Sequence, residues 1–379
     1  MAHRSVAAGR TLGVCLLALA LGGVPGTTRA DHDPPSSLKI MTFNVWHGLR
    51  GERRTRLEGE DPERKERRFE WQVELIEELD PDVLLLQEVN PNARESRKYA
   101  EALGYDQIKK VTSCGLHLPP IKIPCNMNDG LTILARPEFD LKKAGKKRLS
   151  GNAACTATFG FQTTESRYVL LGEITVDGRP ILLATTHLSS PAKVPDDLEA
   201  QLVRLIDEGK LTGEQRDEIL AKMTSKNERN LNEVEGVLRE IDRHRDRRPT
   251  GDPYAYLVLT GDLNTEPDTR PIARIGQAGF VNAADDPSFL TFDPVKNHEN
   301  HAIGSRRTPS LPTFDIEELE EMLAERGADP RQIDYIFVSD GMVPLSARMV
   351  MNKERDGIYP SDHFGLIAVV RLDEPGGGN

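Results

Sequence analysis

Basic residues are in short supply in this chain. It contains 49 lysines and arginines against 60 aspartates and glutamates, which gives a formal net charge of −11. A protein that gains its affinity by neutralising a phosphate backbone usually presents a basic face. The composition therefore argues against a dedicated nucleic-acid-binding protein. One basic patch, Lys142 to Arg148, interrupts the acidic composition. Nucleic acid stays open as a partner, although this patch also suits a solvated loop.

The chain also lacks an apolar run of the length of a membrane span. The apolar stretch from Leu12 to Val24 covers about 13 residues, whereas a span needs roughly 20. Arg4 and Arg10 precede it and small residues up to Ala30 follow it, which is the layout of a secretory signal. We expect residues 1–30 to be a signal peptide and the protein to be secreted, extracellular or periplasmic, with no stable transmembrane segment. Without the three arginines of the signal, the net charge becomes −14.

Cysteines are few, with four in 379 residues. Cys15 would leave with the signal, so Cys114, Cys125 and Cys155 remain. In an oxidising compartment, a disulfide between Cys114 and Cys125 would close a short loop, but pairings with Cys155 are equally open. No Cys-His pattern supports a catalytic thiol.

No linker rich in proline, glycine or serine divides the chain, and no internal repeat is visible. We therefore expect one domain over residues 31–373, with a charged helical insert at about 190–250 and a disordered tail at 374–379. The charge-dense segment Arg50–Arg68 is expected to be an exposed loop that precedes a helix. Oligomeric state is not determined by these features.

Strands outnumber helices in the hydrophobic pattern. Alternating or fully apolar runs bounded by turn residues predict strands, and Asp177-Gly178 predicts a hairpin turn between two of them. Two packed, mainly antiparallel sheets with helices outside fit this pattern better than a parallel doubly wound sheet, which makes the fold class α+β. The predicted strands are 38–46, 83–86, 131–135, 168–176, 180–185, 254–260, 333–338 and 364–372.

Six short segments place a carboxylate, a carboxamide or an imidazole at the edge of such a run. In order they are Met41-Thr42-Phe43-Asn44, Leu86-Gln87-Glu88-Val89, Thr186-His187-Leu188, Gly261-Asp262-Leu263-Asn264, Ile333-Asp334-Tyr335 and Ser361-Asp362-His363-Phe364.

Their order and wording resemble the endonuclease/exonuclease/phosphatase superfamily, in the form of a secreted bacterial-type member. That superfamily includes DNase I-like nucleases, neutral sphingomyelinases and inositol polyphosphate phosphatases. The resemblance covers roughly Leu38 to Leu372. It implies a DNase I-like fold, a four-layer α/β/β/α sandwich.

The residue types suit a hard divalent cation that acts on a phosphoester. Mg²⁺ prefers oxygen ligands and commonly takes one or two carboxylates. Glu88, which follows a fully apolar strand, is the first candidate ligand. The resemblance adds Asn44 and Asp362 to the ligand set. The expected cofactor is Mg²⁺, which Mn²⁺ or Ca²⁺ can replace.

The remaining polar positions suit proton transfer and phosphate binding. A neutral histidine can accept a proton from water near pH 7, and the resemblance makes His363 this base and Asp334 its orienting acid. By the same resemblance, Asp262 and Asn264 position the attacking water and hold phosphate or a second metal, and His187 donates a hydrogen bond to a phosphoryl oxygen.

Asn128 and Asp129 precede a predicted strand where relatives carry a polar residue near the phosphate. The sequence Asn-Asp-Gly is equally typical of a plain turn. Both interpretations stay open.

We therefore expect a secreted, metal-dependent phosphoester hydrolase that attacks phosphorus in line with water. Diesters of lipid headgroups or small molecules are favoured, because an acidic surface tolerates a cationic choline. Inositol phosphatases usually carry Trp-Cys-Asp-Arg where this chain has Gln332 to Tyr335, which argues against that substrate. One alternative is an extracellular DNase I-like nuclease. A non-catalytic binding protein on the same fold is another, disfavoured because all the catalytic positions are occupied.

Overall fold

A computed structural model provides the structure of this protein. The chain divides after Pro34 into two units, and all the structure described here belongs to the second. The described residues are 36–53, 56–114, 128–155, 160–245, 253–299 and 311–373.

Several predictions from the sequence fall outside these residues. They are the signal peptide at 1–30, the tail at 374–379 and Cys125. Cys114 is disulfide-bonded. Within the described ranges, none of the helices combines the length and the apolar character of a membrane span.

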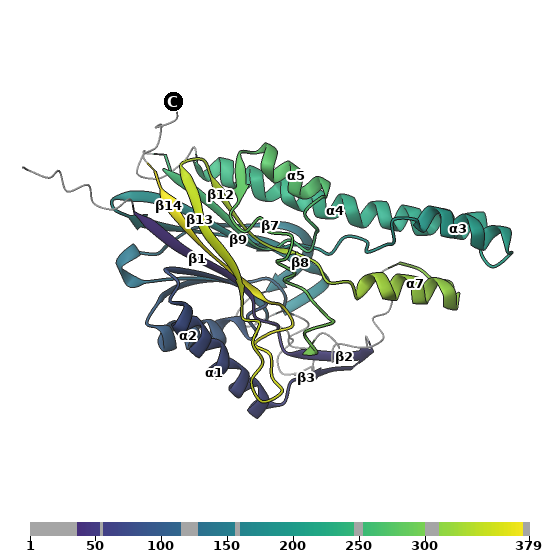
Figure 1. Ribbon diagram of the computed structural model, residues 1–379, viewed down its shortest axis with the longest axis horizontal. Helices are drawn as coiled ribbons and strands as arrows, with labels where there is room; N and C mark the ends of the chain where they lie inside the picture. The colour runs from purple at the N-terminus through teal and green to yellow at the C-terminus, as the bar shows by residue number, and fades with distance from the viewer. Residues whose placement is uncertain are drawn as a thin grey trace, which may run out of the picture. The chain divides into compact units, whose positions relative to one another are not determined.

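Two six-stranded sheets form the centre of the fold (Figure 1). The first has the strand order β13-β14-β1-β4-β6-β5, and the second has the order β11-β12-β10-β9-β8-β7. The strands of the first sheet are β1 (Ser37–Asn44), β4 (Val83–Gln87), β5 (Asp106–Val111), β6 (Gly130–Ala135), β13 (Met342–Val350) and β14 (Gly365–Leu372). Those of the second are β7 (Lys142–Cys155), β8 (Gly160–Val176), β9 (Arg179–His187), β10 (Tyr256–Asp262), β11 (Phe280–Asn282) and β12 (Asp334–Ser339).

Both sheets share one design. Each contains a single parallel pair near its middle, β1 with β4 in the first sheet and β9 with β10 in the second. The other neighbours in both sheets are antiparallel. The predicted hairpin at Asp177-Gly178 is confirmed, because β8 and β9 pair on either side of it and both turn residues have positive φ. The predicted pair of mainly antiparallel sheets is likewise confirmed.

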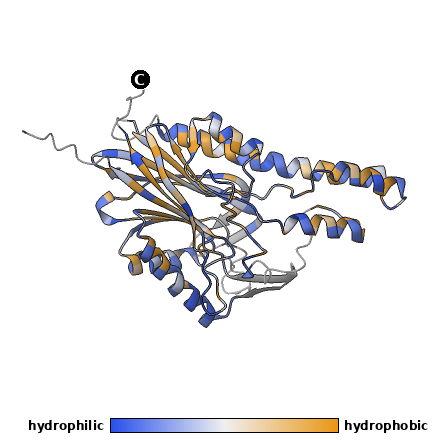
Figure 2. Ribbon diagram, in the orientation of Figure 1, coloured by the Kyte–Doolittle hydropathy of each residue, from blue (hydrophilic) through white to orange (hydrophobic). Residues whose placement is uncertain are grey.

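The main hydrophobic core lies between the two sheets. Leu38, Ile40, Leu85 and Ile133 of the first sheet join it, and their exposed fractions are 0%. The second sheet contributes residues such as Leu170, Ile181, Leu183, Tyr256 and Val258 to the same cluster. Because side chains alternate along a strand, each sheet also has an outer apolar face that needs a cover. Figure 2 shows the strands of both sheets as largely hydrophobic.

Helices cover those outer faces. Apolar residues of α1 (Pro62–Leu79) and α2 (Asn92–Leu103) pack on the first sheet. Those of α4 (Gly213–Arg245) and α5 (Arg270–Gln277) pack on the second. Figure 1 shows the two helix pairs on opposite sides of the sheets. The result is the expected four-layer α/β/β/α sandwich. Smaller elements are the hairpin β2 (Leu49–Arg53) and β3 (Arg56–Gly59) and the 3₁₀ turn η1 (Pro137–Phe139).

The expected loop over Arg50–Arg68 is wrong in part. The segment contains the β2–β3 hairpin, and α1 already begins at Pro62. The side chain of Asp61 accepts hydrogen bonds from the backbone N–H groups of Glu63 and Arg64 at 3.0 and 2.9 Å. Proline at the first helical position and an aspartate cap together favour a helix start. The many charged residues of this segment made the helix start at Asp61-Pro62 hard to recognise from the sequence.

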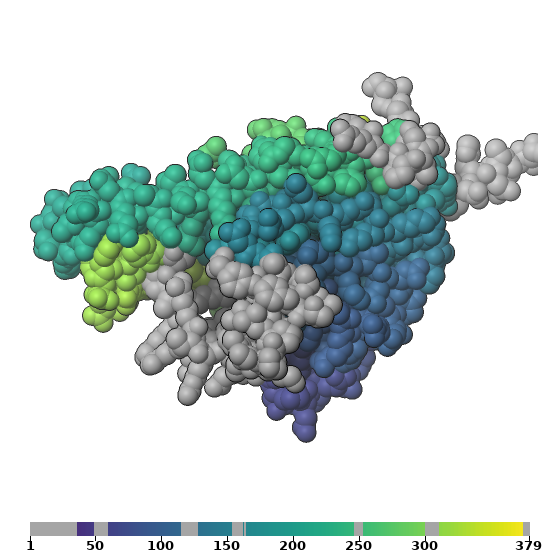
Figure 3. Space-filling view, turned by 180° about the vertical axis from the view of Figure 1, so that it is seen from behind, coloured from purple at the N-terminus to yellow at the C-terminus, as the bar shows by residue number. Residues whose placement is uncertain are grey.

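A separate hydrophobic cluster lies away from the sheets. It joins α3 (Leu198–Asp207), the N-terminal part of α4 and α7 (Glu317–Gly327). Leu202, Ile219 and Leu319 are fully buried in it. Figure 3 shows α7, in yellow-green, against the teal helices α3 and α4. The long helix α4 thus packs on the sheet with its C-terminal half and on α3 and α7 with its N-terminal half.

The close approach of β9 and β10 at Gly261 generates a stability prediction. Gly261 has φ +136°, and a Cβ there would lie 2.0 Å from the carbonyl oxygen of Thr186. We expect Gly261→Ala to lower the free energy of unfolding by about 2 kcal/mol or more, as other strained or overpacked sites do. Urea denaturation of the purified variant measures this.

Gly276→Ala in α5 is the matched control. Apart from the neighbouring backbone of the helix itself, no atom of the described residues lies within 4 Å of the position that a methyl group would take there. Alanine is favoured over glycine in a helix by roughly 0.5–1 kcal/mol. We expect this variant to be as stable as the parent or slightly more stable. Equal stability of Gly261→Ala and the parent would show that β9 and β10 tolerate a side chain between them.

Candidate active site

The two parallel strand pairs end at the same edge of the sandwich. In the first sheet, Asn44 at the end of β1 is in register with Gln87 at the end of β4. In the second, His187 at the end of β9 is in register with Asp262 at the end of β10. Parallel pairing places the carboxyl ends of both strands together, which is where α/β sheets usually bind ligands. This strand arrangement brings predicted site residues of both sheets to one edge.

Polar contacts join the two sheets at this edge. The Asn44 amide nitrogen donates to Oδ2 of Asp262 at 3.1 Å. His187 lies between the sheets, with Nδ1 3.8 Å from Oε1 of Glu88 and Nε2 3.4 Å from Oδ2 of Asp262. Burial and the Arg167 guanidinium hold the pKa of His187 well below its usual value. Asn44, Glu88, His187 and Asp262 therefore form one cluster.

Glu88 follows β4 in a left-handed backbone conformation, with φ 58°. For a residue with a side chain this conformation costs on the order of 1 kcal/mol, and such strain is common at functional sites. The backbone N–H of His47 donates to Oε2 of Glu88 at 3.1 Å, and Nε2 of His47 lies 3.6 Å from the same oxygen. Burial alone would raise the pKa of Glu88, but His47, His187 and His363 lower it to about 2. The carboxylate therefore stays ionised.

His363 and Asp334 form a buried hydrogen-bonded pair. Nδ1 of His363 lies 2.9 Å from Oδ2 of Asp334, and Nε2 lies 3.8 Å from Oδ2 of Asp262. Thr291 Oγ1 accepts the backbone N–H of Asp334 at 3.1 Å, and the Phe292 ring meets the imidazole edge-on at 5.3 Å. Although burial disfavours its charge, Asp334 and Asp262 raise the pKa of His363 to about 10.

Asp262 lies between His187 and His363, with its Oδ2 3.4 Å from Nε2 of His187 and 3.8 Å from Nε2 of His363. Burial, followed by the charges of Asp334 and Glu88, raises its pKa to about 7, although His363 opposes the shift. The backbone N–H of Asn264 donates to its Oδ1 at 2.9 Å. Asn264 also has a positive φ, 55°, which asparagine tolerates well. Asp262 and Asn264 are thus held in one turn after β10.

Asp362 is tied to the site through Ser361. The Ser361 hydroxyl lies 2.6 Å from the backbone oxygen of Asn44 and 3.2 Å from Oδ1 of Asp362. The Arg68 guanidinium supports this loop from α1, because its Nη1 donates to the backbone oxygens of Val45 and Pro360 at 2.7 and 3.4 Å. The charge of Asp362 also contributes to the raised pKa of His363.

The structure separates the two residues of the Asn-Asp-Gly turn. Asn128 is exposed and hydrogen-bonds Asn90 and Asn92 through its backbone. Asp129 is 3% exposed, and burial followed by the Glu165 and Glu88 charges raises its pKa to about 7. Among the described residues, nothing hydrogen-bonds its Oδ1. Asp129 is therefore buried close enough to Glu88 to feel its charge, whereas Asn128 lies at the surface.

The donor set fits a divalent cation. Glu88 and Asp262 bring carboxylate oxygens to the two sides of His187. Burial, followed by the negative charges of Asp334 and Glu88, raises the pKa of Asp262. Ligand atoms of Asp262, Asp334 and His363 also lie within 4.8 Å of one another. However, Asp334 and His363 already hydrogen-bond each other, so Glu88 with Asp262 is the better oxygen pair for Mg²⁺.

Three supporting residues were missed at the sequence level. They are His47 beside Glu88, Thr291 under Asp334 and Phe292 against His363. A signal existed for His47, which comes three residues after Asn44 at the end of β1. Thr291 and Phe292 lie in an irregular segment far from every motif, so only the tertiary fold brings them here.

The sequence profile of the Endonuclease/Exonuclease/phosphatase family matches residues 41–363. The chain belongs to this family. Members are phosphoester hydrolases and generally use divalent metals. No curated protein sequence matches the chain significantly.

Solved structures share the fold at low identity. D. rerio TDP2 complexed with a single-strand DNA product has a TM-score of 0.52 at 16% identity, covering 89% of this chain and 99% of that chain. A family protein from Bacteroides thetaiotaomicron has a TM-score of 0.51 at 16% identity, covering 90% and 99%. One from Bacteroides vulgatus has a TM-score of 0.52 at 15% identity, covering 89% and 100%. These similarities show the four-layer fold.

The clustered carboxylates predict that a divalent cation stabilises the protein. A cation that binds only the folded state adds about 2.7 kcal/mol at 100 times its dissociation constant. We expect Mg²⁺ to raise the melting temperature of the parent and to have little effect on Glu88→Gln. Differential scanning calorimetry with and without EDTA measures this.

Glu218→Gln is the control, because Glu218 is an exposed residue of α4. It should keep the full response to Mg²⁺. A response that survives in Glu88→Gln would remove Glu88 from the metal site.

Proposed function

We propose that this chain is a divalent-metal-dependent phosphodiesterase. The observation that carries the proposal is the convergence of Glu88, His187 and Asp262 with the His363–Asp334 pair at one buried edge. Family membership supports phosphoester hydrolysis in general. A binding protein that had lost catalysis would not need all these groups in contact.

Each residue has a task in this proposal. Asp334 holds Nδ1 of His363, so Nε2 is the atom that exchanges a proton with the reacting water or leaving oxygen. His187 and Asn44 supply hydrogen-bond donors beside Asp262, where the phosphoryl oxygens would lie. Glu88, Asp262 and, through the resemblance, Asn44 and Asp362 would hold the cation. When bound, Mg²⁺ neutralises phosphoryl charge and favours attack by water.

Small-molecule or lipid-headgroup diesters are our first choice of substrate. The support is the net charge of −11, which disfavours a long polyanion. Nucleic acid is the second candidate, because D. rerio TDP2 was solved with a single-strand DNA product and shares the fold. At 16% identity this similarity supports the shared fold, so nucleic acid ranks second.

We also propose that the protein is exported. The N-terminal pattern of Arg4, Arg10 and the apolar stretch that follows supports a signal peptide. The disulfide at Cys114 supports an oxidising compartment. Expression with and without residues 1–30, followed by fractionation and mass determination of the secreted form, tests cleavage after Ala30.

Hydrolysis of bis-p-nitrophenyl phosphate provides the test of activity. We expect turnover with Mg²⁺, loss of turnover with EDTA, and recovery when Mg²⁺ returns. His363→Ala and Asp334→Asn should each lower kcat by about 10²–10⁴, the usual contribution of a positioned proton-transfer group. Sphingomyelin and plasmid DNA, assayed in parallel, rank the two substrate classes.

Exposed His298 provides a matched histidine control. His298→Ala should retain parental turnover, and circular dichroism should show all variants folded. Turnover that is independent of metal, or full activity in folded His363→Ala, would overturn the proposed mechanism.

A further inference from the structure

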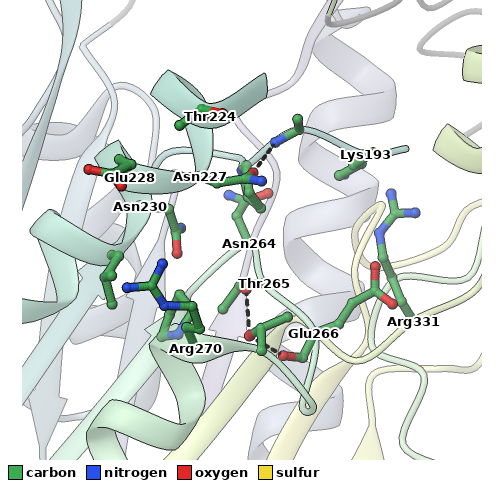
Figure 4. Close-up of a pocket in the computed structure, with 15 residues that line it drawn as sticks. Lys193, Thr224, Asn227, Glu228, Asn230, Asn264, Thr265, Glu266, Arg270 and Arg331 are labelled. Atoms are coloured by element: carbon green, nitrogen blue, oxygen red, sulfur yellow. Dashed lines mark hydrogen bonds between the residues drawn. The ribbon is translucent and has the colours of Figure 1, made fainter. Parts of the chain in front are cut away.

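A pocket of about 430 Å³ opens beside the candidate active site (Figure 4). One wall is the middle of α4, from Thr224 to Leu231, where the helix crosses between its two hydrophobic clusters. The other walls are the segments Pro191–Lys193 and Asn264–Pro271, together with Arg331. The volume lies within the range of small-ligand pockets. The charged insert therefore shapes a cavity next to the catalytic edge.

The pocket shares residues and contacts with the site. Asn264 lines it with its side chain, while its backbone N–H binds Asp262. Phe292 connects the two regions, because its ring meets His363 on one side and lies 4.7 Å from the Arg331 guanidinium. A substrate with its phosphate at Asp262 and His363 would place a neighbouring group here.

The lining is locally cationic in an acidic protein. Lys193, Arg270 and Arg331 line the pocket with two acids, Glu228 and Glu266. Glu266 pairs with Arg326, whose Nη2 lies 2.9 Å from its Oε1 and whose Nη1 lies 3.0 Å from Oδ2 of Asp329. Arg270 is exposed and forms no ion pair with any described residue. A group with negative charge is therefore favoured over a cationic one such as choline.

The pocket wall contains a buried side-chain amide, Asn230, whose hydrogen bonding is incomplete among the described residues. Asn230 is 1% exposed, and its amide nitrogen donates to the backbone oxygens of Ser189 and Leu263 at 2.7 and 3.0 Å. Among the described residues, none donates to its Oδ1. Figure 4 shows Asn230 extending from α4 toward the segment that carries Asn264 and Arg270. A buried acceptor without a partner is costly, and a ligand hydroxyl would satisfy it.

We propose that this pocket binds a phosphorylated polyol attached to the scissile phosphodiester. The proposal rests on the proposed phosphodiesterase function and names its substrate class. Hydroxyls of the polyol pair with Asn230, and its second phosphate pairs with Arg270 and Lys193. Because none of the described residues that line the pocket is aromatic, they offer no surface for stacking a base. Recognition is directed at the sugar phosphate.

Matched chromogenic substrates test this proposal. The first pair is the p-nitrophenyl ester of thymidine 5′-phosphate, with and without a 3′-phosphate. The second pair is the p-nitrophenyl ester of glycerol phosphate, with and without a terminal phosphate. All release p-nitrophenolate, so kcat/KM can be compared directly. We expect the extra phosphate to raise kcat/KM by about tenfold, which corresponds to about 1.4 kcal/mol, and p-nitrophenylphosphorylcholine to be a poorer substrate.

In Arg270→Gln, the ratio of kcat/KM with the extra phosphate to kcat/KM without it should fall to near one. Arg239→Gln is the control, since Arg239 is an exposed arginine of helix α4 that does not line the pocket, and it should keep the parental gain. Lys193→Gln provides a second test on the opposite wall. If the extra phosphate raises kcat/KM in both pairs, the natural substrates are free polyol phosphates. If it raises kcat/KM in the thymidine pair alone, the natural substrate is nucleic acid.

The outcomes separate this proposal from the proposed function. Absence of metal-dependent hydrolysis of bis-p-nitrophenyl phosphate would overturn both. Hydrolysis of that ester with no gain from the second phosphate, a preference for the choline ester, or an unchanged gain in Arg270→Gln would overturn the pocket's role alone.

Discussion

The structure depends on keeping several ionisable groups buried at the junction of two sheets. The hydrogen bond from Asn44 to Asp262, at 3.1 Å, crosses that junction. It joins the end of β1 in one sheet to the end of β10 in the other, and His187 adds contacts to Glu88 and Asp262. Such contacts form only when both parallel pairs end at one edge. The single parallel pair within each sheet is therefore the constraint from which the site follows.

Burying these charges is expensive, and the fold compensates locally. An unpaired charge in a protein interior costs several kcal/mol. Here Glu88 is surrounded by imidazoles, His363 is hydrogen-bonded to Asp334, and Arg68 forms an ion pair with Glu60 at 2.6 Å while holding the loop before Ser361. Asp262 keeps a raised pKa, because it is buried and lies near the negative charges of Asp334 and Glu88. A bound cation would offset those charges, so the donor set suits a metal.

The sequence predicted much of the fold because its signals are local. Alternation and turn residues indicated the strands, and the six motifs stand at strand ends, where Asn44, Glu88 and Asp262 are indeed found. The start of α1 was missed because charge density concealed the Asp61-Pro62 cap. Thr291 and Phe292 could not be foreseen, since their role depends on contacts with residues more than 40 positions away.

The substrate was the hardest property to infer from composition, for a physical reason. Net charge averages over the whole surface, whereas recognition depends on the few side chains within a Debye length of the ligand. The acidic total of −11 allowed a cationic headgroup, but the pocket beside Asn264 gathers Lys193, Arg270 and Arg331. These residues come from three distant segments, and α4 supplies the polar wall opposite them. The helical insert thus adds a binding surface beside the active-site edge of the two sheets. For a ligand in this pocket, the charge of the lining residues matters more than the net charge of the whole chain.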